Sequence, residues 1–106
     1  MTAHETPAYF VFRNRVLDEE AMQVYIPKAV ETLAAHGAEI IVLTEDSAAI
    51  EGASDLPRTV IIKFASRERA EGWYNSPEYQ EVLPIRLGAT EGTAVLLDGF
   101  EAAAHA

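Results

Sequence analysis

The stretch Arg58–Leu87 restricts the possible folds of this chain more than any other part of the sequence. It opens with a strand-forming segment, Thr59–Phe64 (TVIIKF), which is rich in residues with high β-preference. A helix with an amphipathic pattern is predicted next, over Arg67–Tyr74. Ser76 and Pro77 then end this helix and start another, because serine is a good N-cap and proline fits the first helical position. The stretch therefore predicts a strand followed by two helical pieces.

The residues before this stretch predict a strand, a helix and a second strand. The first strand is expected over Ala8–Val16, where four consecutive aromatic or aliphatic residues indicate that both faces are covered. Asp18 is a good N-cap for a helix whose apolar residues recur every three or four positions, up to a C-cap at Gly37. Pro27 should kink or restart this helix, because proline removes one hydrogen-bond donor. The second strand is expected over Ala38–Thr44.

The remaining segments predict a loop and a last strand. Glu45–Pro57 contains Asp, Ser, Gly and Pro without clear periodicity, as in a loop between two antiparallel strands. Gly88 and Gly92 bracket a connection, and Thr93–Leu97 is the last strand. The order β-α-β-β-α-β predicts an α+β, ferredoxin-like fold, with a four-stranded antiparallel sheet and its helices on one face. We expect one domain over residues 1–106, with frayed tails at 1–7 and 100–106.

The strands predict more apolar surface than the helices can cover. Two helices shield one face of the sheet only, whereas the strands carry apolar side chains at both parities. An exposed apolar patch of several hundred Å² is rare on a monomer. A second copy of the same sheet is the simplest cover, so we expect a homodimer with the sheets packed face to face.

The charge and composition exclude several classes of partner. The chain has 17 acidic and 8 basic residues and a formal charge of −9, which repels nucleic acid and anionic membrane surfaces. No apolar run approaches the roughly 18 residues of a membrane span, and no signal-peptide pattern begins the sequence. The chain contains no cysteine, so disulfides and thiolate chemistry are excluded. A cytoplasmic location is the expectation.

The segment from Pro57 to Arg86, with its Trp73-Tyr74 and Ser76-Pro77 pairs, resembles the family called domain of unknown function 1330. The similarity also covers Asp18–Gly37 and Glu51-Gly52. The resemblance implies a dimeric α/β barrel. That superfamily includes cofactor-free quinone-forming monooxygenases, muconolactone isomerases, haem-dependent chlorite dismutases and ligand-sensing domains, so the fold alone implies no single function. Ala38, where a second glycine is common, and Pro27 depart from the family pattern.

Three aromatic residues of this segment are candidates for a small-molecule pocket. Trp73, Tyr74 and Tyr79 offer apolar walls with polar groups at their edges. The structural alternative is that Trp73 anchors the core and that the tyrosines bond to backbone groups, since aromatic residues on the apolar face of a helix usually belong to the core.

Three basic residues complete the set of candidates. Arg86 falls on the apolar face of its helix, where its guanidinium needs a ligand anion or a structural partner such as Glu51, Glu78 or an acidic residue of a second subunit. Arg58 presents the same choice, and an exposed strand end favours the structural role. His36 is a possible general base, but its place in the last helical turn also favours it as a cation on the helix dipole.

Two functions remain open at this level. The first is an enzyme acting without a cofactor on a small aromatic or carbonyl-bearing molecule, with Trp73, Tyr79 and Arg86 as pocket walls and oxyanion partner. The alternative is a non-catalytic ligand-binding or purely structural homodimer. No His, Asp or Glu spacing predicts a metal site, and no glycine-rich phosphate loop is present.

Overall fold

The computed structural model describes residues 6–53 and 55–100 and confirms the ferredoxin-like α+β fold. Four antiparallel strands form one sheet in the order β2-β3-β1-β4. Their bounds are Ala8–Val16 for β1, Glu39–Thr44 for β2, Arg58–Phe64 for β3 and Thr90–Asp98 for β4. The frayed tails predicted at 1–7 and 100–106 fall almost entirely outside the described residues.

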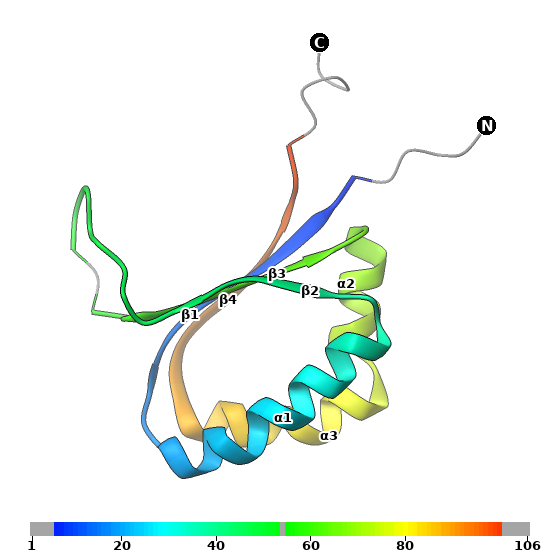
Figure 1. Cartoon of the computed structure of the whole chain (residues 1–106), viewed down its shortest axis with the longest axis horizontal. Helices are drawn as coiled ribbons and strands as arrows, with labels where there is room; N and C mark the ends of the chain where they lie inside the picture. Colours follow the sequence, from blue (N-terminus) through cyan, green and yellow to red (C-terminus); the bar gives the residue numbers. More distant parts are fainter. Residues whose placement is uncertain (1–5, 54, 101–106) are drawn as a thin grey trace.

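Three helices cover one face of this sheet (Figure 1). α1 spans Glu19–Ala35, α2 spans Arg67–Tyr74, and α3 spans Pro77–Ala89. On β1 and β3 every second residue is buried, which identifies the face that the helices cover. The prediction of helices on one face is therefore confirmed. The second helical segment is divided into α2 and α3 at Ser76 and Pro77.

The helices begin where capping residues stand in the sequence. The Asp18 carboxylate accepts a hydrogen bond from the Ala21 backbone N–H at 3.1 Å, and two glutamates occupy the first turn of α1. Ser76 Oγ accepts from the Tyr79 N–H at 3.2 Å and starts α3 directly before Pro77. Gly37 has φ 68°, the left-handed conformation predicted for the residue that ends α1.

Pro27 does not divide α1, so the expected restart of the helix is wrong. α1 is continuous from Glu19 to Ala35. Pro27 is exposed, and the backbone carbonyl that loses its intrahelical donor is that of Gln23, which is also exposed. Water can satisfy this carbonyl, and the buried face of the helix keeps its apolar contacts.

The predicted connection around Gly88 and Gly92 is also wrong. α3 continues to Ala89, and β4 begins at the next residue and is longer than the predicted Thr93–Leu97. The long strand β1 explains the difference, because β4 pairs with it over its whole length, from Asp98 to Thr90. The Ala89 carbonyl accepts backbone hydrogen bonds from Leu17 and Asp18, which fixes the junction of α3 and β4 beside the start of α1.

The face of the sheet away from the helices carries an apolar stripe across all four strands. Val42, Ile61, Val11 and Val95 are direct cross-strand neighbours on this open face. Val95 keeps 47% of its surface exposed, and nothing in the described chain covers this face. The loop between β2 and β3 projects beyond the sheet on this side (Figure 1).

Gly92 is required by the close approach of β4 to β1. A Cβ at this position would lie 2.1 Å from the Arg13 carbonyl oxygen and 2.6 Å from the Asn14 Cα, and φ is 154°. We therefore expect Gly92→Ala to lower the free energy of unfolding by about 1–3 kcal/mol, as overpacking does. Urea denaturation measures this change.

Gly88→Ala is the matched control. Gly88 lies in exposed helix with no atom within 4 Å of an added Cβ, so alanine should raise the free energy of unfolding by up to about 1 kcal/mol. Equal effects of the two substitutions would contradict the steric argument.

Candidate functional site

A cleft lies between α1 and the helix-covered face of the sheet. α1 packs mainly against α3 and leaves space beside β2 and β3. The volume of the cleft for water-sized molecules is about 50 Å³, several times the space that one water needs. Its walls are mostly apolar and consist of Phe12, Tyr25, Ile26, Ala29, Val30, Leu33, Ile40, Leu43, Val60, Ile62 and Trp73, together with Asn14, Arg58 and Arg86.

The polar side chains of the cleft come from neighbouring positions in the fold. Asn14 on β1 is the direct cross-strand neighbour of Arg58 on β3, and both lie on the helix-covered face. Arg86 reaches the same cleft from α3. All three are buried, with 2% of Asn14, 9% of Arg58 and 8% of Arg86 exposed. The expectation that Arg58 occupies an exposed strand end is therefore wrong.

Arg86 is held by aromatic groups. Its Nε donates a hydrogen bond to the Tyr79 hydroxyl oxygen at 3.3 Å, and its guanidinium carbon lies 5.0 Å from the centroid of the Phe12 ring. The predicted pairing with Glu51 or Glu78 does not occur, because Arg86 forms no ion pair with any described residue. Arg86 also interacts with the Tyr25 side chain, and it lines the cleft.

Two tyrosine hydroxyls extend this polar group. Tyr25 Oη and Tyr79 Oη are 2.6 Å apart, and Tyr79 is completely buried. Burial, reinforced by the neighbouring Tyr79, raises the pKa of Tyr25 well above its usual range, although Arg86 opposes the shift. Tyr25 is therefore a neutral hydrogen-bond donor at physiological pH. Because Tyr25 lines the cleft and Tyr79 does not, Tyr79 connects Arg86 to Tyr25 from behind.

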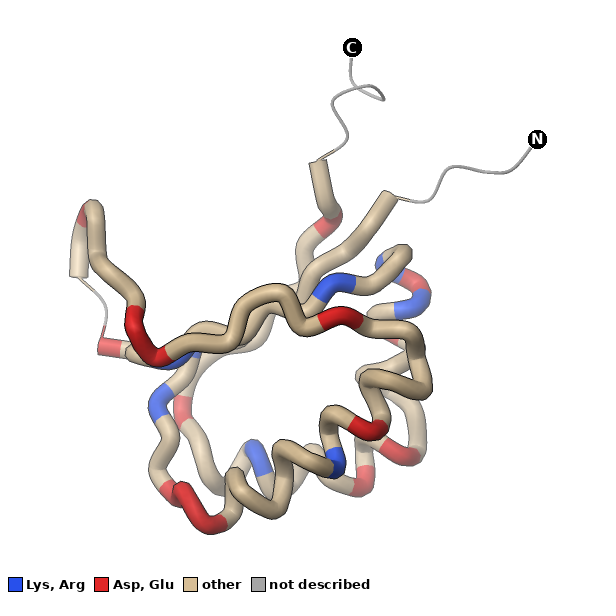
Figure 2. The backbone as a smooth tube through the Cα atoms, in the orientation of Figure 1, with Lys and Arg blue, Asp and Glu red and all other residues tan. Residues whose placement is uncertain are grey.

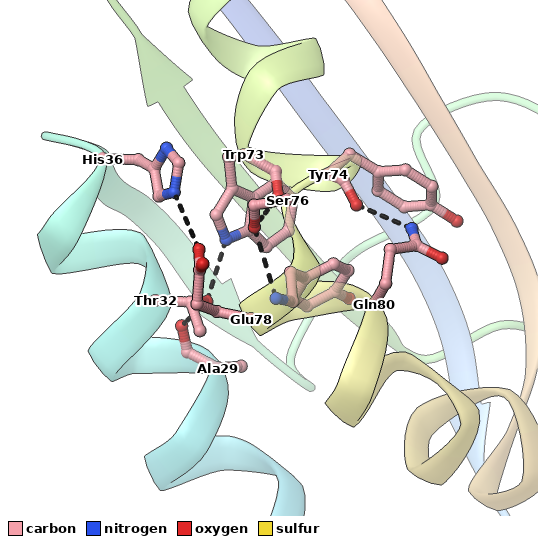
Figure 3. Close-up of polar contacts among 9 residues, drawn as sticks. Ala29, Thr32, His36, Trp73, Tyr74, Ser76, Glu78 and Gln80 are labelled. Atoms are coloured by element: carbon pink, nitrogen blue, oxygen red, sulfur yellow. Dashed lines mark hydrogen bonds and ion pairs between the residues drawn. The ribbon is translucent and has the colours of Figure 1, made fainter.

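Trp73 is first of all a core residue, as the structural alternative stated. It is 1% exposed, its ring centroid lies 4.1 Å from that of Tyr79, and its Nε1 donates to Thr32 Oγ1 at 3.0 Å (Figure 3). Trp73 also lines the cleft. Tyr74 stacks on Phe10 at 5.6 Å and does not reach the cleft.

His36 lies outside the cleft. It caps the end of α1, and its Nε2 is 3.7 Å from a carboxylate oxygen of Glu78 near the start of α3 (Figure 3). This contact joins the C-terminus of α1 to the N-terminus of α3, where the helix dipole favours the Glu78 carboxylate. A structural role accounts for His36, and nothing places it near the cleft.

Sequence reasoning missed two residues of this site, Asn14 and Tyr25. In the sequence, Asn14 lies in the polar stretch that ends the first predicted strand, and Tyr25 is one of the periodic apolar positions of the first predicted helix. The signal for Asn14 was its parity, because it shares the inward face with Phe10 and Phe12. A polar residue at an inward strand position needs a hydrogen-bond partner in the interior. No sequence pattern predicts the meeting of Tyr25 with Tyr79.

Two classes of site have no support in the described residues. No group of three or more His, Asp or Glu side chains within residues 6–53 and 55–100 has a geometry that could hold a metal ion. None of the described helices is long and apolar enough to cross a membrane. Acidic positions are spread over the helices, the ends of β2 and β4 and the loop before β3 (Figure 2).

A comparison with protein families matches residues 7–100 to a family model described as domain of unknown function 1330. The chain belongs to this family. The resemblance inferred from Pro57–Arg86 is thereby confirmed over nearly the whole chain. A comparison with curated proteins found no match.

Solved structures with the same fold include proteins of known and unknown activity. A protein of unknown function from Rhodopseudomonas palustris has a TM-score of 0.77 at 15% identity, covering 92% of this chain and 85% of its own. The hydroxynitrile lyase from Passiflora edulis has a TM-score of 0.65 at 17% identity, with 93% and 97% covered. The cofactor-independent oxygenase SnoaB from Streptomyces nogalater has a TM-score of 0.63 at 9% identity, with 91% and 95% covered. At these identities the likeness shows the fold alone.

The Tyr79 hydroxyl should matter for stability more than that of a neighbouring tyrosine. Tyr79→Phe leaves Arg86 Nε without its acceptor and the Tyr25 hydroxyl without its partner, both in the interior. We expect the free energy of unfolding to fall by about 1–3 kcal/mol, measured by urea denaturation.

Tyr74→Phe is the control. The Tyr74 hydroxyl has no hydrogen bond to the described part of the chain, so its loss should change stability by less than about 0.5 kcal/mol. The proposed connection from Arg86 to Tyr25 is wrong if the two variants are equally stable.

Proposed function

We propose that the cleft binds a small organic molecule through an anionic or carbonyl oxygen, and that the chain is an enzyme that stabilises negative charge on this oxygen without a bound cofactor. The observation that carries the proposal is the pair of buried guanidinium groups, Arg58 and Arg86, in a cleft with mainly apolar walls. Neither is paired with a carboxylate of the described residues. The apolar walls suit a hydrophobic substrate body.

Two physical properties of arginine support this proposal. The guanidinium stays protonated at all physiological pH values, so both side chains carry their charge in the cleft. A buried charge without a counter-ion is costly, and an anionic ligand or transition state relieves that cost. Donors that are already oriented towards a developing oxyanion typically contribute about 10²–10³ in rate each.

Tyr25 is proposed as a third donor. The Tyr79 hydroxyl accepts a hydrogen bond from Arg86 and can donate one to the Tyr25 oxygen. The Tyr25 O–H is then free to point into the cleft. A hydrogen-bond chain that starts at a cation polarises each member in turn and strengthens the last donor. Tyr25 would therefore contribute a hydrogen bond to the same oxygen that the arginines stabilise.

The lining residues restrict the type of reaction. Within the described residues, no carboxylate or imidazole lines the cleft, so proton abstraction by a side chain is not supported. The cationic environment favours substrates that ionise themselves, such as phenols, enols and small acids. The fold is compatible with such chemistry, because it is shared by a cofactor-independent oxygenase and by a hydroxynitrile lyase.

A thermal-shift screen with small acids, phenols and quinones tests the proposal. A ligand at about 100 times its Kd stabilises the native state by about 2.7 kcal/mol, which raises the Tm of a domain of this size by about 10 °C. We expect an acid or phenol to produce such a rise, and Arg86→Gln to abolish it.

Arg69→Gln removes an equal charge from the exposed face of α2 and should leave the rise unchanged. Failure of every compound to raise the Tm, or equal rises in wild type and Arg86→Gln, would contradict the proposal.

We also propose that the chain forms a homodimer through the open face of the sheet. This proposal holds whether the protein is an enzyme or a non-catalytic homodimer. The supporting observation is the cross-strand stripe of Val42, Ile61, Val11 and Val95, flanked by a Leu97 that is 48% exposed. Packing two copies of this face together removes apolar area from water on both. Arg86 and Tyr79 lie on the helix-covered side, so the dimer would leave the cleft in place.

Sedimentation velocity tests the dimer. Wild type should sediment as a dimer at micromolar concentration, and Val95→Glu should sediment as a monomer, because it places a charge in the apolar stripe that the dimer would bury. Leu87→Glu introduces the same charge at an exposed site of α3 and should remain dimeric. A wild-type monomer would overturn the proposed interface.

A further inference from the structure

Asn14 carries a buried acceptor with no partner. Its Oδ1 is the one buried side-chain nitrogen or oxygen atom of the described residues that lacks a hydrogen bond. Native proteins rarely leave such an atom unpaired without a water, an ion or a ligand to complete it. Asn14 also lines the cleft, so the missing donor has a route of entry.

The surroundings of Asn14 leave the cleft as the side from which a donor can arrive. On β4 its cross-strand neighbour is Gly92, whose backbone comes so close that an added Cβ would lie 2.8 Å from the Asn14 Cβ. On β3 its neighbour is Arg58, which is a donor only and forms no side-chain hydrogen bond to a described residue. Asn14 and Arg58 thus present one free acceptor and one free cationic donor group next to each other.

This pair specifies two groups on a ligand. A free guanidinium matches a carboxylate, with two parallel N–H···O bonds. The Asn14 oxygen needs a hydroxyl or other donor. Directly opposed residues in an antiparallel pair have Cβ atoms about 4.5–5.5 Å apart, so a small ligand whose carboxylate and hydroxyl are close together can contact both side chains. A hydroxyl on the carbon next to the carboxylate meets this requirement.

The rest of the cleft specifies an apolar remainder. Ile26, Val30, Ile40 and Leu43 line the cleft and are each more than one-third exposed, which gives the opening between α1 and β2 an apolar rim. The space for water-sized molecules is small, so a short branched aliphatic group fits better than a long chain.

We infer that the cleft selects small 2-hydroxycarboxylates with an apolar substituent, the carboxylate bound by Arg58 and the hydroxyl donating to Asn14 Oδ1. The apolar substituent points towards Ile40 and Leu43. Arg86 from α3 and Tyr25 from α1 then donate hydrogen bonds to the same carboxylate. This inference rests on the proposed anion-binding function of the same cleft and adds the ligand class and the role of Asn14.

Isothermal titration calorimetry with three matched probes tests the ligand class. The probes are 2-hydroxyisovalerate, isovalerate, which lacks the hydroxyl, and 2-hydroxyisovaleramide, which lacks the charge. A neutral hydrogen bond predicts that wild type binds 2-hydroxyisovalerate about two- to tenfold more tightly than isovalerate. Loss of the charge-assisted bonds predicts at least about tenfold weaker binding of the amide.

Variants separate the two recognition groups. Asn14→Leu should bind both acids with equal affinity, because the acceptor for the hydroxyl is gone while Arg58 remains. Arg58→Gln should lose the preference for acid over amide, and Arg69→Gln should behave as wild type. Asn14→Leu also removes an unpaired acceptor, so its Tm without ligand should be no lower than that of wild type. If it does not fold, Asn14→Ala provides the same comparison.

The outcomes distinguish this inference from the function on which it rests. Equal affinities of wild type for the two acids, with binding weakened by Arg58→Gln, would overturn the role of Asn14 and leave the anion-binding cleft standing. An unchanged hydroxyl preference in Asn14→Leu would overturn it equally. Absence of binding by either acid at millimolar concentration would overturn the proposed ligand class, while a Tm rise with phenols that Arg86→Gln abolishes would still support the proposed function.

Discussion

The burial of Trp73 is the interaction on which the rest of the structure depends. Its ring contacts Phe10 and Phe64 on two central strands, while its Nε1 reaches Thr32 on α1. Tyr79, from the start of α3, packs against the same ring. One side chain thus joins the sheet and all three helices, and the Ser76-Pro77 turn is what brings α3 back against it. Because Trp73 fixes Tyr79, it also fixes the hydroxyl that holds Arg86.

The site follows from a break in an otherwise apolar pattern. Two inward rows of the sheet, around Phe10 with Ile62 and around Phe12 with Val60, are hydrophobic, and the next row is Asn14 with Arg58. Placing these groups in the interior costs desolvation free energy that no described carboxylate repays. The ligand proposed for the cleft would restore the lost interactions, which gives a physical reason to keep these groups there. The same reasoning explains why the cation Arg86 is held by rings and a hydroxyl, which leave part of its charge available.

The fold was predictable because its signals are local. Caps at Asp18 and Ser76, the left-handed Gly37 and the period-two pattern of the strands each depend on neighbours in sequence. The errors arose where tertiary contacts overrode local preference. β4 starts at Thr90 because β1 offers pairing partners that far, and α1 passes Pro27 because its opposite face is buried.

The sequence by itself determined the order of the elements and the family to which the chain belongs, since periodicity, capping and short motifs are read from adjacent residues. It also determined that Arg58 and Arg86 needed partners. Only the tertiary structure decided which groups meet: Tyr25 with Tyr79, and Arg86 with Phe12. It also decided that Asn14 lines the cleft with its Oδ1 unpaired. Those contacts join residues from different elements, and their geometry depends on how the helices pack on the sheet, for which no sequence spacing is a guide.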